Sequence, residues 1–403
     1  MLECQAFQRC AVSRRLRLYK AASPLDVTLV RSTVTAMGFD MRRSAWNLLR
    51  LADVSGLRRR VRRLMVPLVL SLPMTATAAS WWCNWFPWLC ATPSARCGMP
   101  LTEITEFGSN PGELKMCRYI PAGLGTSRPL VVALHGCRQQ ADSYDDEPGW
   151  IKFADKFGFV LLLPQQQQSN NANSCFNWFE PGDSARDRGE ALSIRQMISK
   201  TAGDARIDPQ RVYVTGLSAG GAMAAVMLAA YPEVFAGGAI LAGVPYRCAN
   251  GVIEALNRCG VSLSGRMAPI KDLTPAQWGA LVHAASSHRA PFPRVSIWQG
   301  TTDTTVNPQS QRELVDQWTY LHGIDQTPDA EDTIDGHVHK LYKDAHGKVL
   351  VETYLINGMG HGTPIDPGVA DDQCGKVAPF TLNVGVCSSF LILKFWGTFW
   401  KPG

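Results

Sequence analysis

From about residue 129 onward, short and almost wholly apolar runs alternate with longer segments of helical periodicity. Unbroken apolar runs bounded by turn residues are typical of strands buried on both faces of a sheet. We expect such strands at 129–134, 157–164, 211–215, 237–243 and 293–300. We expect helices at 150–156, 190–202, 309–321 and from 388 onward. This alternation predicts an α/β fold, with a mostly parallel central sheet and helices on both faces.

Two hairpins and one insertion complete the predicted organisation. The Asn-Pro-Gly turn at 110–112 lies between two alternating runs and predicts an N-terminal hairpin over 107–121. A second hairpin is expected near the C-terminus, over 339–356. Residues 246–290 are expected to form an insertion over the functional site, with an Ala-rich helix around Trp278.

A Gly-x-Ser-x-Gly motif, centred on Ser218, follows the apolar run at 211–215 and precedes a stretch of small, helix-forming residues. Strand, sharp turn and helix in this order are typical of a nucleophile elbow. The turn places the serine in a strained backbone conformation, and Gly216 and Gly220 lack the Cβ atoms that would clash there. A chance match is the alternative, but the order of the elements favours function. We predict that Ser218 is a nucleophile.

A serine hydroxyl needs a base to take its proton, and the base needs a carboxylate to hold it. His361 lies in a glycine-rich loop after a predicted strand, and Asp303 comes directly after another. The chain order Ser218, Asp303, His361 is that of α/β hydrolases. Asp183 and Asp187 precede the nucleophile, and Asp303 has the alternative role of capping the next helix or turn. We predict Asp303 as the acid and His361 as the base.

The other histidines have less suitable positions for a catalytic base. His337, His339 and His346 belong to the C-terminal hairpin, where we expect them to be exposed to solvent. His322 lies at a helix end, and His135 lies in the loop after the strand at 129–134. We expect His135 to have a structural role in that loop.

Cleavage of an ester also requires N–H donors for the oxyanion of the tetrahedral intermediate. The backbone N–H of Ala219, directly after the nucleophile, is one candidate. The N–H of Cys137, in the His135-Gly136-Cys137 loop, is the other. We expect the Cys137 thiol to bond Cys175, because such a bridge would hold the oxyanion loop and the loop around Trp178 rigid.

The cysteine content agrees with an exported protein. Of twelve cysteines, Cys4 and Cys10 lie in the part of the chain that we expect to be absent from the mature protein. An even number remains, which suggests disulfides: Cys83, Cys90, Cys97, Cys117, Cys137, Cys175, Cys248, Cys259, Cys374 and Cys387. The most natural local pairs are Cys248 with Cys259 and Cys374 with Cys387. Cysteine and histidine spacings typical of zinc sites are absent from the sequence, so we expect no metal.

The N-terminal part has the pattern of a secretory signal. A basic cluster at 58–63 precedes an apolar run at 64–72 and the small residues of 76–79. The run is too short and too interrupted by proline for a membrane span. A basic amphipathic surface segment is the alternative. Because signals begin near the first residue, we expect translation to start at an internal methionine, such as Met37 or Met41.

These boundaries divide the chain into three parts. We predict a presequence at 1–79, with its signal at about 41–79 and, under the hypothesis of an internal start, a stretch at 1–36 that is not translated. A segment rich in Trp and Cys follows at 80–98, and the catalytic domain occupies 99–403. The aromatic residues of 80–98 either pack on the body or form an exposed face that grips an insoluble substrate, and burial is their commoner role.

The formal net charge of +6 is concentrated in the presequence. Residues 1–79 contain 14 Lys and Arg and 4 Asp and Glu, a net of +10, which leaves −4 for the remainder. A mildly acidic body gives no electrostatic reason to expect nucleic-acid binding.

Several separate motifs resemble the PHB depolymerase family of esterases, over roughly residues 100–400. They are 107–121, Leu134-His135-Gly136-Cys137, 174–179, 216–221 and 358–362. More narrowly, the chain resembles extracellular short-chain polyhydroxyalkanoate depolymerases, and related feruloyl and acetylxylan esterases share the fold and the elbow. The resemblance implies an α/β-hydrolase fold, the triad Ser218, Asp303 and His361, and the Cys137 N–H in the oxyanion hole. It also implies that Trp178 lines the hydroxyacyl subsite, and we add His135 as a second candidate for contact with substrate.

One departure from the family changes the expected substrate. Longer polymer-degrading members have a linker and a separate substrate-binding domain after the catalytic part, whereas this sequence ends at Gly403. We therefore give more weight to soluble oligomers, amorphous polymer or plant-wall esters than to crystalline polymer.

The sequence thus predicts a secreted serine esterase, periplasmic or extracellular and monomeric, that needs no cofactor. Polyesters of the poly(3-hydroxybutyrate) type or their oligomers are the expected substrates. The first alternative is a feruloyl or acetylxylan esterase. The second is a catalytically inactive hydrolase-fold protein that binds polymer or cell wall.

Overall fold

The computed structural model describes residues 97–262 and 264–398. The predicted signal, Cys83, Cys90 and the Trp-rich part of 80–98 lie outside these described residues. Within them, no helix is both long and apolar enough to cross a membrane.

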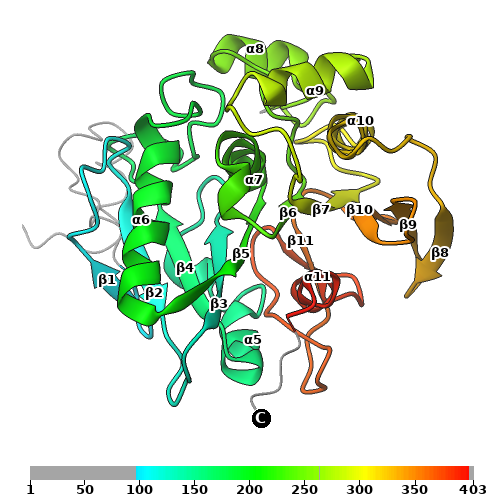
Figure 1. Cartoon of the computed structure of the whole chain (residues 1–403). Helices are drawn as coiled ribbons and strands as arrows, with labels where there is room; N and C mark the ends of the chain where they lie inside the picture. The colour runs from blue at the N-terminus through cyan, green and yellow to red at the C-terminus, as the bar shows by residue number, and fades with distance from the viewer. Residues whose placement is uncertain (1–96, 263, 399–403) are drawn as a thin grey trace, which may run out of the picture. The chain divides into compact units, whose positions relative to one another are not determined.

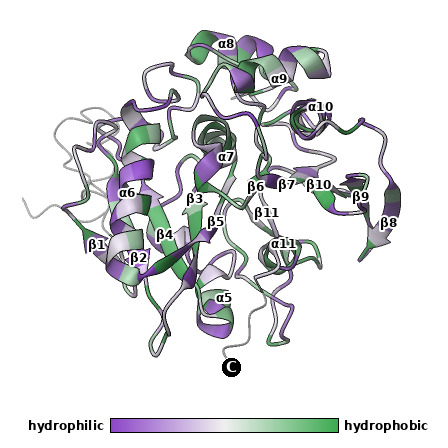
Figure 2. Ribbon diagram, viewed as in Figure 1, coloured by the Kyte–Doolittle hydropathy of each residue, from purple (hydrophilic) through white to green (hydrophobic). Residues whose placement is uncertain are grey.

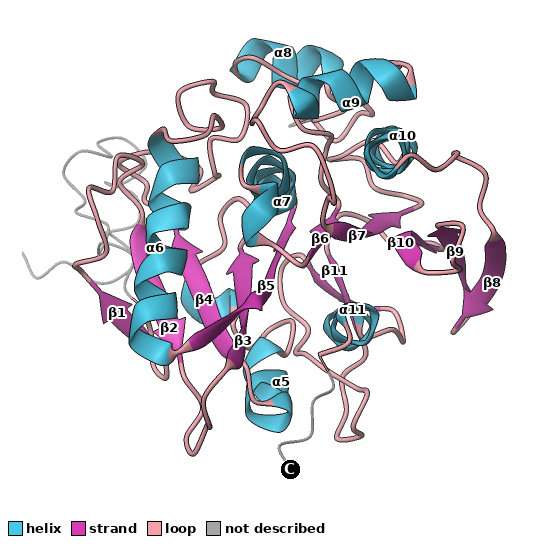
Figure 3. Ribbon diagram, viewed as in Figure 1, coloured by secondary structure: helices cyan, strands magenta, loops and turns pink. Residues whose placement is uncertain are grey.

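The centre of the fold is a ten-stranded sheet, drawn in magenta in Figure 3. Its strands from one edge to the other are β1 (Thr102–Ile104), β2 (Lys115–Tyr119), β4 (Val160–Gln165), β3 (Arg128–Leu134), β5 (Ile207–Leu217), β6 (Gly237–Leu241), β7 (Arg294–Gly300), β10 (Val349–Ile356), β9 (His337–Lys343) and β8 (Ala330–Ile334). The strands from β4 to β10 in this order run parallel, and antiparallel strands complete both edges. The mostly parallel sheet predicted from the apolar runs is confirmed.

Helices cover both faces of the sheet (Figure 1). One face packs against α6 (Gly189–Ala205), α7 (Ala219–Ala230) and α10 (Ser310–His322), and the other against α5 (Trp150–Phe157) and α11 (Ser388–Trp396). Strand β3 shows why both layers form, because Leu130 and Val132 belong to the first core while Val131 and Ala133 belong to the second. Each Val or Leu side chain buried in this way contributes roughly 1.5–3 kcal/mol to folding.

The two helices beside the central strands differ in their surroundings. All residues of α7 are buried, which fits its uniformly small and apolar sequence. Helix α6 keeps one polar face in solvent, and Figure 2 shows purple and green residues alternating along it. The difference places α7 at the centre of the domain and α6 on its surface.

The predicted insertion at 246–290 contains two helices, α8 (Val252–Arg258) and α9 (Pro275–His283). Helix α9 packs on α10 through the buried Trp278, whose Nε1–H donates to Glu313 at 2.9 Å. A Thr274 capping box and a proline in the first turn begin α9.

The short elements were not predicted. The Asn110 turn forms, with the Glu113 N–H donating to the Asn110 carbonyl, but the strand before it is β1 at Thr102–Ile104 and does not adjoin the turn. The helix α4 (Ala141–Tyr144), strand β8 and a small parallel pair, β11 (Thr363–Ile365) with β12 (Thr381–Asn383), were also missed. Segments of three to five residues show too little periodicity to be recognised, and distant partners decide their pairing.

Candidate active site

The carboxyl ends of the central strands lie level with one another. Leu134 of β3 pairs with Gly216 of β5, and Gly300 of β7 pairs with Ile356 of β10. Because parallel strands end at a common edge, the loops that follow β3, β5, β7 and β10 open on the same side of the sheet. Cys137, Ser218, Asp303 and His361 lie in these four loops, one in each.

Ser218 occupies the turn between β5 and α7 in a conformation that non-glycine residues rarely adopt, with φ 58° and ψ −117°. Its N–H donates to the carbonyl of Leu241 at 2.8 Å, which ties the turn to the neighbouring strand β6. A Cβ on Gly216 would lie 2.4 Å from the backbone of Gly220, so the turn closes only with glycine at that position. The motif therefore has the geometry of a nucleophile elbow.

The structure brings Asp303 and His361 together across 58 residues of sequence. The Nδ1 atom of His361 lies 2.7 Å from Oδ2 of Asp303, whose side chain is fully buried. Three further donors orient this carboxylate: the N–H groups of Thr305 and Val306, at 2.8 and 2.9 Å, and Nε2 of Gln299, at 3.0 Å. A carboxylate with so many donors accepts the Nδ1–H of the imidazole, which leaves Nε2 free to take a proton.

Backbone contacts between two loops create this pairing. Thr301 donates its N–H to the carbonyl of Ile356, and Thr302 donates its own to the carbonyl of Met359, both at 3.0 Å. The Thr302 hydroxyl adds a bond to the Gly358 carbonyl at 3.1 Å. These bonds join the loop after β7 to the glycine-rich loop after β10. Asp303 is the residue after Thr302, and His361 lies two residues after Met359.

The loop after β3 leaves one backbone donor available. The Gly136 N–H donates to Oε1 of Gln139 at 2.8 Å, the Arg138 N–H to the Asn173 carbonyl at 2.8 Å, and the Gln139 N–H to the Gly136 carbonyl at 3.2 Å. Across the part of the chain that the structure describes, the Cys137 N–H has no such acceptor. Ala219 begins α7, and the first N–H groups of a helix have no intrahelical acceptor. These are the two donors named from the sequence.

Four disulfides lie within the described residues. Cys137–Cys175, Cys248–Cys259 and Cys374–Cys387 are the three pairs expected from the sequence. The fourth, Cys97–Cys117, was not expected, because its partners are separated by 20 residues in segments without a recognisable loop pattern. The Cys137–Cys175 bridge joins the loop after β3 to the segment that leads to Trp178.

His135 is buried, and both of its ring nitrogens are occupied. Nδ1 donates to the Gly136 carbonyl at 2.7 Å, and Nε2 accepts the N–H of Gln166 at 3.1 Å. Burial lowers the pKa of His135 to about 4, so the ring is neutral at physiological pH. Neither nitrogen remains for a ligand. We therefore withdraw His135 as a substrate contact and retain its structural role in the loop.

Trp178 lies in the loop after β4 and keeps 9% of its surface exposed. Its ring packs edge-on against Phe179, with centroids 5.3 Å apart. The Phe179 carbonyl accepts the N–H of Gly251 at 2.7 Å, which connects this loop to the insertion at 246–290. Trp178 thus has a fixed position and a small accessible surface.

The expectation that the hairpin histidines are all exposed was wrong for two of them. His337 and His339 are buried, whereas His346 is exposed at the turn. Strand β8 pairs with one edge of β9 and β10 with the other, and His339 bonds Asp332 of β8 at 2.8 Å and Glu352 of β10 at 3.4 Å. The two carboxylates raise the pKa of His339 against the opposing effect of burial. Because β8 was not predicted, the contact of His339 with Asp332 was missed.

Phe380 is a neighbour of His361 that sequence reasoning did not find. Its ring centroid lies 6.1 Å from that of His361 in an edge-on arrangement, and 37% of the residue is exposed. The carbonyl of Phe380 accepts the N–H of Thr363, which holds the aromatic ring beside the imidazole. No local pattern marks this residue, because 17 positions separate Thr363 from Phe380 and the pairing of β11 with β12 brings them together.

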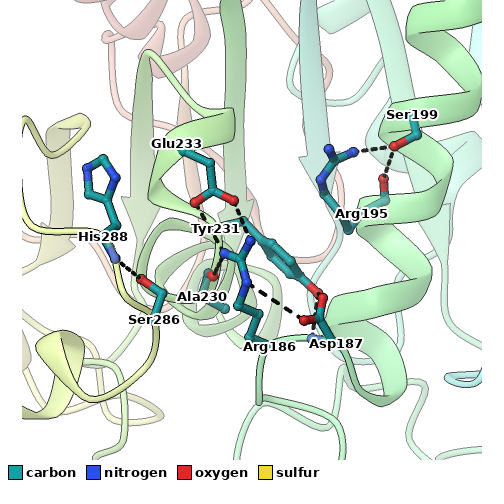
Figure 4. Close-up of polar contacts among 9 residues, drawn as sticks. All are labelled: Arg186, Asp187, Arg195, Ser199, Ala230, Tyr231, Glu233, Ser286 and His288. Carbon is teal, nitrogen blue, oxygen red and sulfur yellow. Dashed lines mark hydrogen bonds and ion pairs between the residues drawn. The ribbon is translucent and has the colours of Figure 1, made fainter.

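A groove of about 660 Å³ lies apart from these residues, between α6 and the end of α7. Four of its lining residues, Arg186, Asp187, Tyr231 and Glu233, form one cluster of polar contacts (Figure 4). Arg186 donates to both carboxylate oxygens of Glu233, at 3.2 and 2.7 Å, and stacks over the Tyr231 ring. The Tyr231 hydroxyl bonds Asp187. We infer that these contacts hold the segment before α6 against the segment after α7.

Comparisons with known proteins show which sequences and which solved structure are similar to this chain. A family model described as "Esterase PHB depolymerase" matches residues 114–334. Poly(3-hydroxyalkanoate) depolymerase C of Paucimonas lemoignei is 51% identical over 298 residues, covering 74% of this chain and 70% of that protein. Feruloyl esterase B of Talaromyces stipitatus is 30% identical over 280 residues, covering 68% and 75%. The solved acetyl xylan esterase from Aspergillus awamori shares the fold, with a TM-score of 0.59, 23% identity and coverage of 74% and 99%.

Proposed function

Because the chain belongs to the esterase PHB depolymerase family, we propose that it cleaves poly(3-hydroxybutyrate)-type polyesters or their oligomers through an acyl-serine intermediate. The protein is a carboxylic-ester hydrolase. The observation that carries the proposed mechanism is the 2.7 Å contact of His361 with Asp303, at the sheet edge that also holds the strained Ser218.

In the first half of the proposed reaction, Oγ of Ser218 attacks the ester carbonyl while Nε2 of His361 takes the hydroxyl proton. Asp303 stabilises the imidazolium that forms. The N–H groups of Cys137 and Ala219 donate to the oxyanion, and loss of one such donor costs about 10²–10³-fold in kcat. The imidazolium then returns its proton to the leaving alkoxide oxygen, and an alcohol departs from the acyl-enzyme.

In the second half, His361 takes a proton from water, and the hydroxide oxygen attacks the acyl carbonyl of the Ser218 ester. Collapse of this second tetrahedral intermediate breaks the acyl–Oγ bond, and the proton returns to Ser218. The acid product leaves. For a polyester substrate, each cycle therefore produces one new hydroxyl end and one new carboxyl end.

Three observations support the substrate and the compartment. The identity to the polyhydroxyalkanoate depolymerase, 51%, exceeds the 30% identity to the feruloyl esterase. Trp178 offers a small apolar surface beside the disulfide-tied loop, which suits a short hydroxyacyl unit. The four disulfides favour an oxidising compartment, and we propose that the protein is secreted. A feruloyl or acetylxylan esterase is the second candidate.

The test compares hydrolysis of a soluble 3-hydroxybutyrate oligomer, amorphous poly(3-hydroxybutyrate), methyl ferulate and acetylated xylan by the purified protein. Preference for the two hydroxybutyrate substrates supports the proposal, and preference for ferulate or acetylxylan overturns its substrate. Ser218→Ala is the control, and it should fold normally without turnover.

A fluorophosphonate should label Ser218 in the folded protein. If no adduct forms, the acyl-serine mechanism is wrong and a binding protein is favoured.

A further inference from the structure

Glu190, the second residue of α6, has a fully buried carboxylate that accepts hydrogen bonds from three separate residues. Oε2 accepts the backbone N–H of Asn177 at 2.8 Å. Oε1 accepts Nε2 of Gln166 at 2.5 Å and Nδ2 of Asn170 at 3.1 Å. These donors lie in the loop between β4 and α6, so one side chain holds this loop at three points.

Gln166 extends the network to the oxyanion loop. Its Nε2 also donates to the Cys175 carbonyl at 3.0 Å, and Cys175 is bonded to Cys137. The backbone N–H of Gln166 donates to Nε2 of His135 at 3.1 Å. Two short paths therefore lead from the Glu190 carboxylate to the loop that presents the Cys137 N–H.

Asn177 extends the network in the other direction, because Trp178 is the next residue. The Asn177 amide oxygen also accepts Nδ2 of Asn171 at 2.8 Å, while its backbone N–H remains on Glu190. Trp178 thus directly follows a residue, Asn177, whose backbone N–H is held by Glu190. A shift of Glu190 would move the tryptophan together with the loop.

This arrangement is costly for stability. Burial raises the pKa of Glu190 to about 8, and the nearby Asp183 contributes to this rise against the opposing effect of the donors, so ionising this carboxyl at neutral pH costs free energy. Buried charged groups are often replaceable by apolar residues of similar volume without loss of stability. Stability of the fold therefore does not explain why a carboxyl group is buried here. Its contacts with the loops that contain Cys137 and Trp178 explain it better.

We propose that Glu190 is a positioning residue for ester hydrolysis, which holds the Cys137 N–H in place through Gln166 and holds Trp178 in place through Asn177. This inference rests on the proposed function. Glu190 itself contacts neither the substrate nor the reacting atoms in this assignment.

The variant Glu190→Gln tests the proposal with almost no change in volume. A glutamine oxygen satisfies the donors on one side only, and its NH₂ group then faces an N–H donor on the other side. We expect kcat for a soluble hydroxybutyrate ester to fall by about ten-fold or more, because sub-ångström misplacement of catalytic groups is expensive. We also expect KM to rise, because Trp178 shifts.

The matched control is Glu313→Gln, at another fully buried glutamate, which accepts Nε1–H of Trp278 in the contact between α9 and α10. It should lower Tm but leave kcat unchanged. Kinetics are normalised to the folded enzyme by titration with a fluorophosphonate. A kcat and KM for folded Glu190→Gln within two-fold of wild type would overturn the inference.

A second variant keeps the proposal testable if Glu190→Gln fails to fold. Gln166→Met removes the amide between Glu190 and Cys175 but retains the backbone N–H to His135. It should also lower kcat, and wild-type kinetics would count against the proposal. If the wild-type protein neither turns over esters nor reacts with the fluorophosphonate, the proposed function itself has failed.

Discussion

A Cβ atom on Gly220 would stand 2.1 Å from the carbonyl oxygen of Leu134, so the first turn of α7 rests directly on the end of β3. This contact affects where the two proposed oxyanion donors lie. The loop after β3 contains Cys137, and the turn before Gly220 contains Ala219. Backbone contact between the two segments brings both proposed oxyanion donors to the same edge of the sheet. The two backbones are so close at this point that no side chain fits between them.

The first prediction follows from this close contact. Gly220→Ala should lower Tm strongly and abolish activity. The added methyl group would meet the backbone carbonyl of Leu134, which cannot rotate away as a side chain could. The control is Gly203→Ala in the exposed part of α6, where a Cβ meets nothing within 4 Å. That change should stabilise the protein by up to about 1 kcal/mol, the usual gain of alanine over glycine in a helix. Thermal unfolding measures both, and an active, stable Gly220→Ala protein would contradict the contact.

The second prediction concerns the acid of the proposed triad. In Asp303→Asn, the Oδ1 atom can still accept the N–H groups of Thr305 and Val306, so the loop should fold. The amide NH₂ would instead face Nδ1 of His361 and favour the tautomer that cannot take the serine proton. We expect kcat to fall by roughly 10⁴-fold, with little change in KM. Steady-state kinetics on the folded variant test this, and a loss below ten-fold would assign the acid role elsewhere.

The third prediction compares two disulfides. Replacing both Cys137 and Cys175 with serine should lower Tm and also kcat, because the bridge holds the loop with the Cys137 N–H. Replacing both Cys97 and Cys117 should lower Tm but leave kcat of the folded protein unchanged. Loss of a native disulfide typically costs about 2–5 kcal/mol. Equal effects on kcat from the two pairs would show that the first bridge has no special relation to catalysis.

The fourth prediction concerns the pH dependence of stability. Asp145 is 1% exposed, and burial, with repulsion from Asp146 and Asp142, raises its pKa to about 7. The unfolded carboxyl ionises near pH 4. Between these values the folded state holds the proton that the unfolded state releases, so the contribution of Asp145 to stability falls as pH rises from about 4 to 7.

Asp145→Asn removes this titration. Relative to the variant, the wild type should lose roughly 1–4 kcal/mol of unfolding free energy across this window, and nothing more above about pH 7. Urea unfolding of both proteins at pH 4.5, 6 and 8 measures the difference. A difference that does not vary with pH would show that the folded carboxyl titrates normally.

Local chemistry explains why much of the site was predictable. The elbow requires a particular backbone turn, and the residues of that turn are adjacent in sequence, so Gly216, Ser218 and Gly220 identify it. The long apolar strands and the helices were likewise predicted from short-range periodicity. The positions of Asp303 and His361 followed from one more rule, that parallel strands end at a common edge.

Residues whose roles depend on distant partners were not predictable in the same way. His339 was expected to be exposed, but it is buried, with Tyr354 stacked on its ring and Asp332 and Glu352 bonded to its nitrogens. Glu190 was noted only as the start of a helix, since its donors come from loop residues whose arrangement no periodicity indicates. Cys97 and Cys117 pair because β2 and the segment before β1 meet in space.

The sequence by itself determined the class of fold and led to the proposed nucleophile and to the order of the proposed acid and base, because each depends on residues that are neighbours along the chain or on a general rule of sheets. Only the tertiary structure decided which polar groups are buried and which donors remain available. Burial and hydrogen bonding depend on what packs against a side chain from elsewhere in the chain. The occupied ring of His135 and the available N–H of Cys137, two residues apart, show that difference most directly.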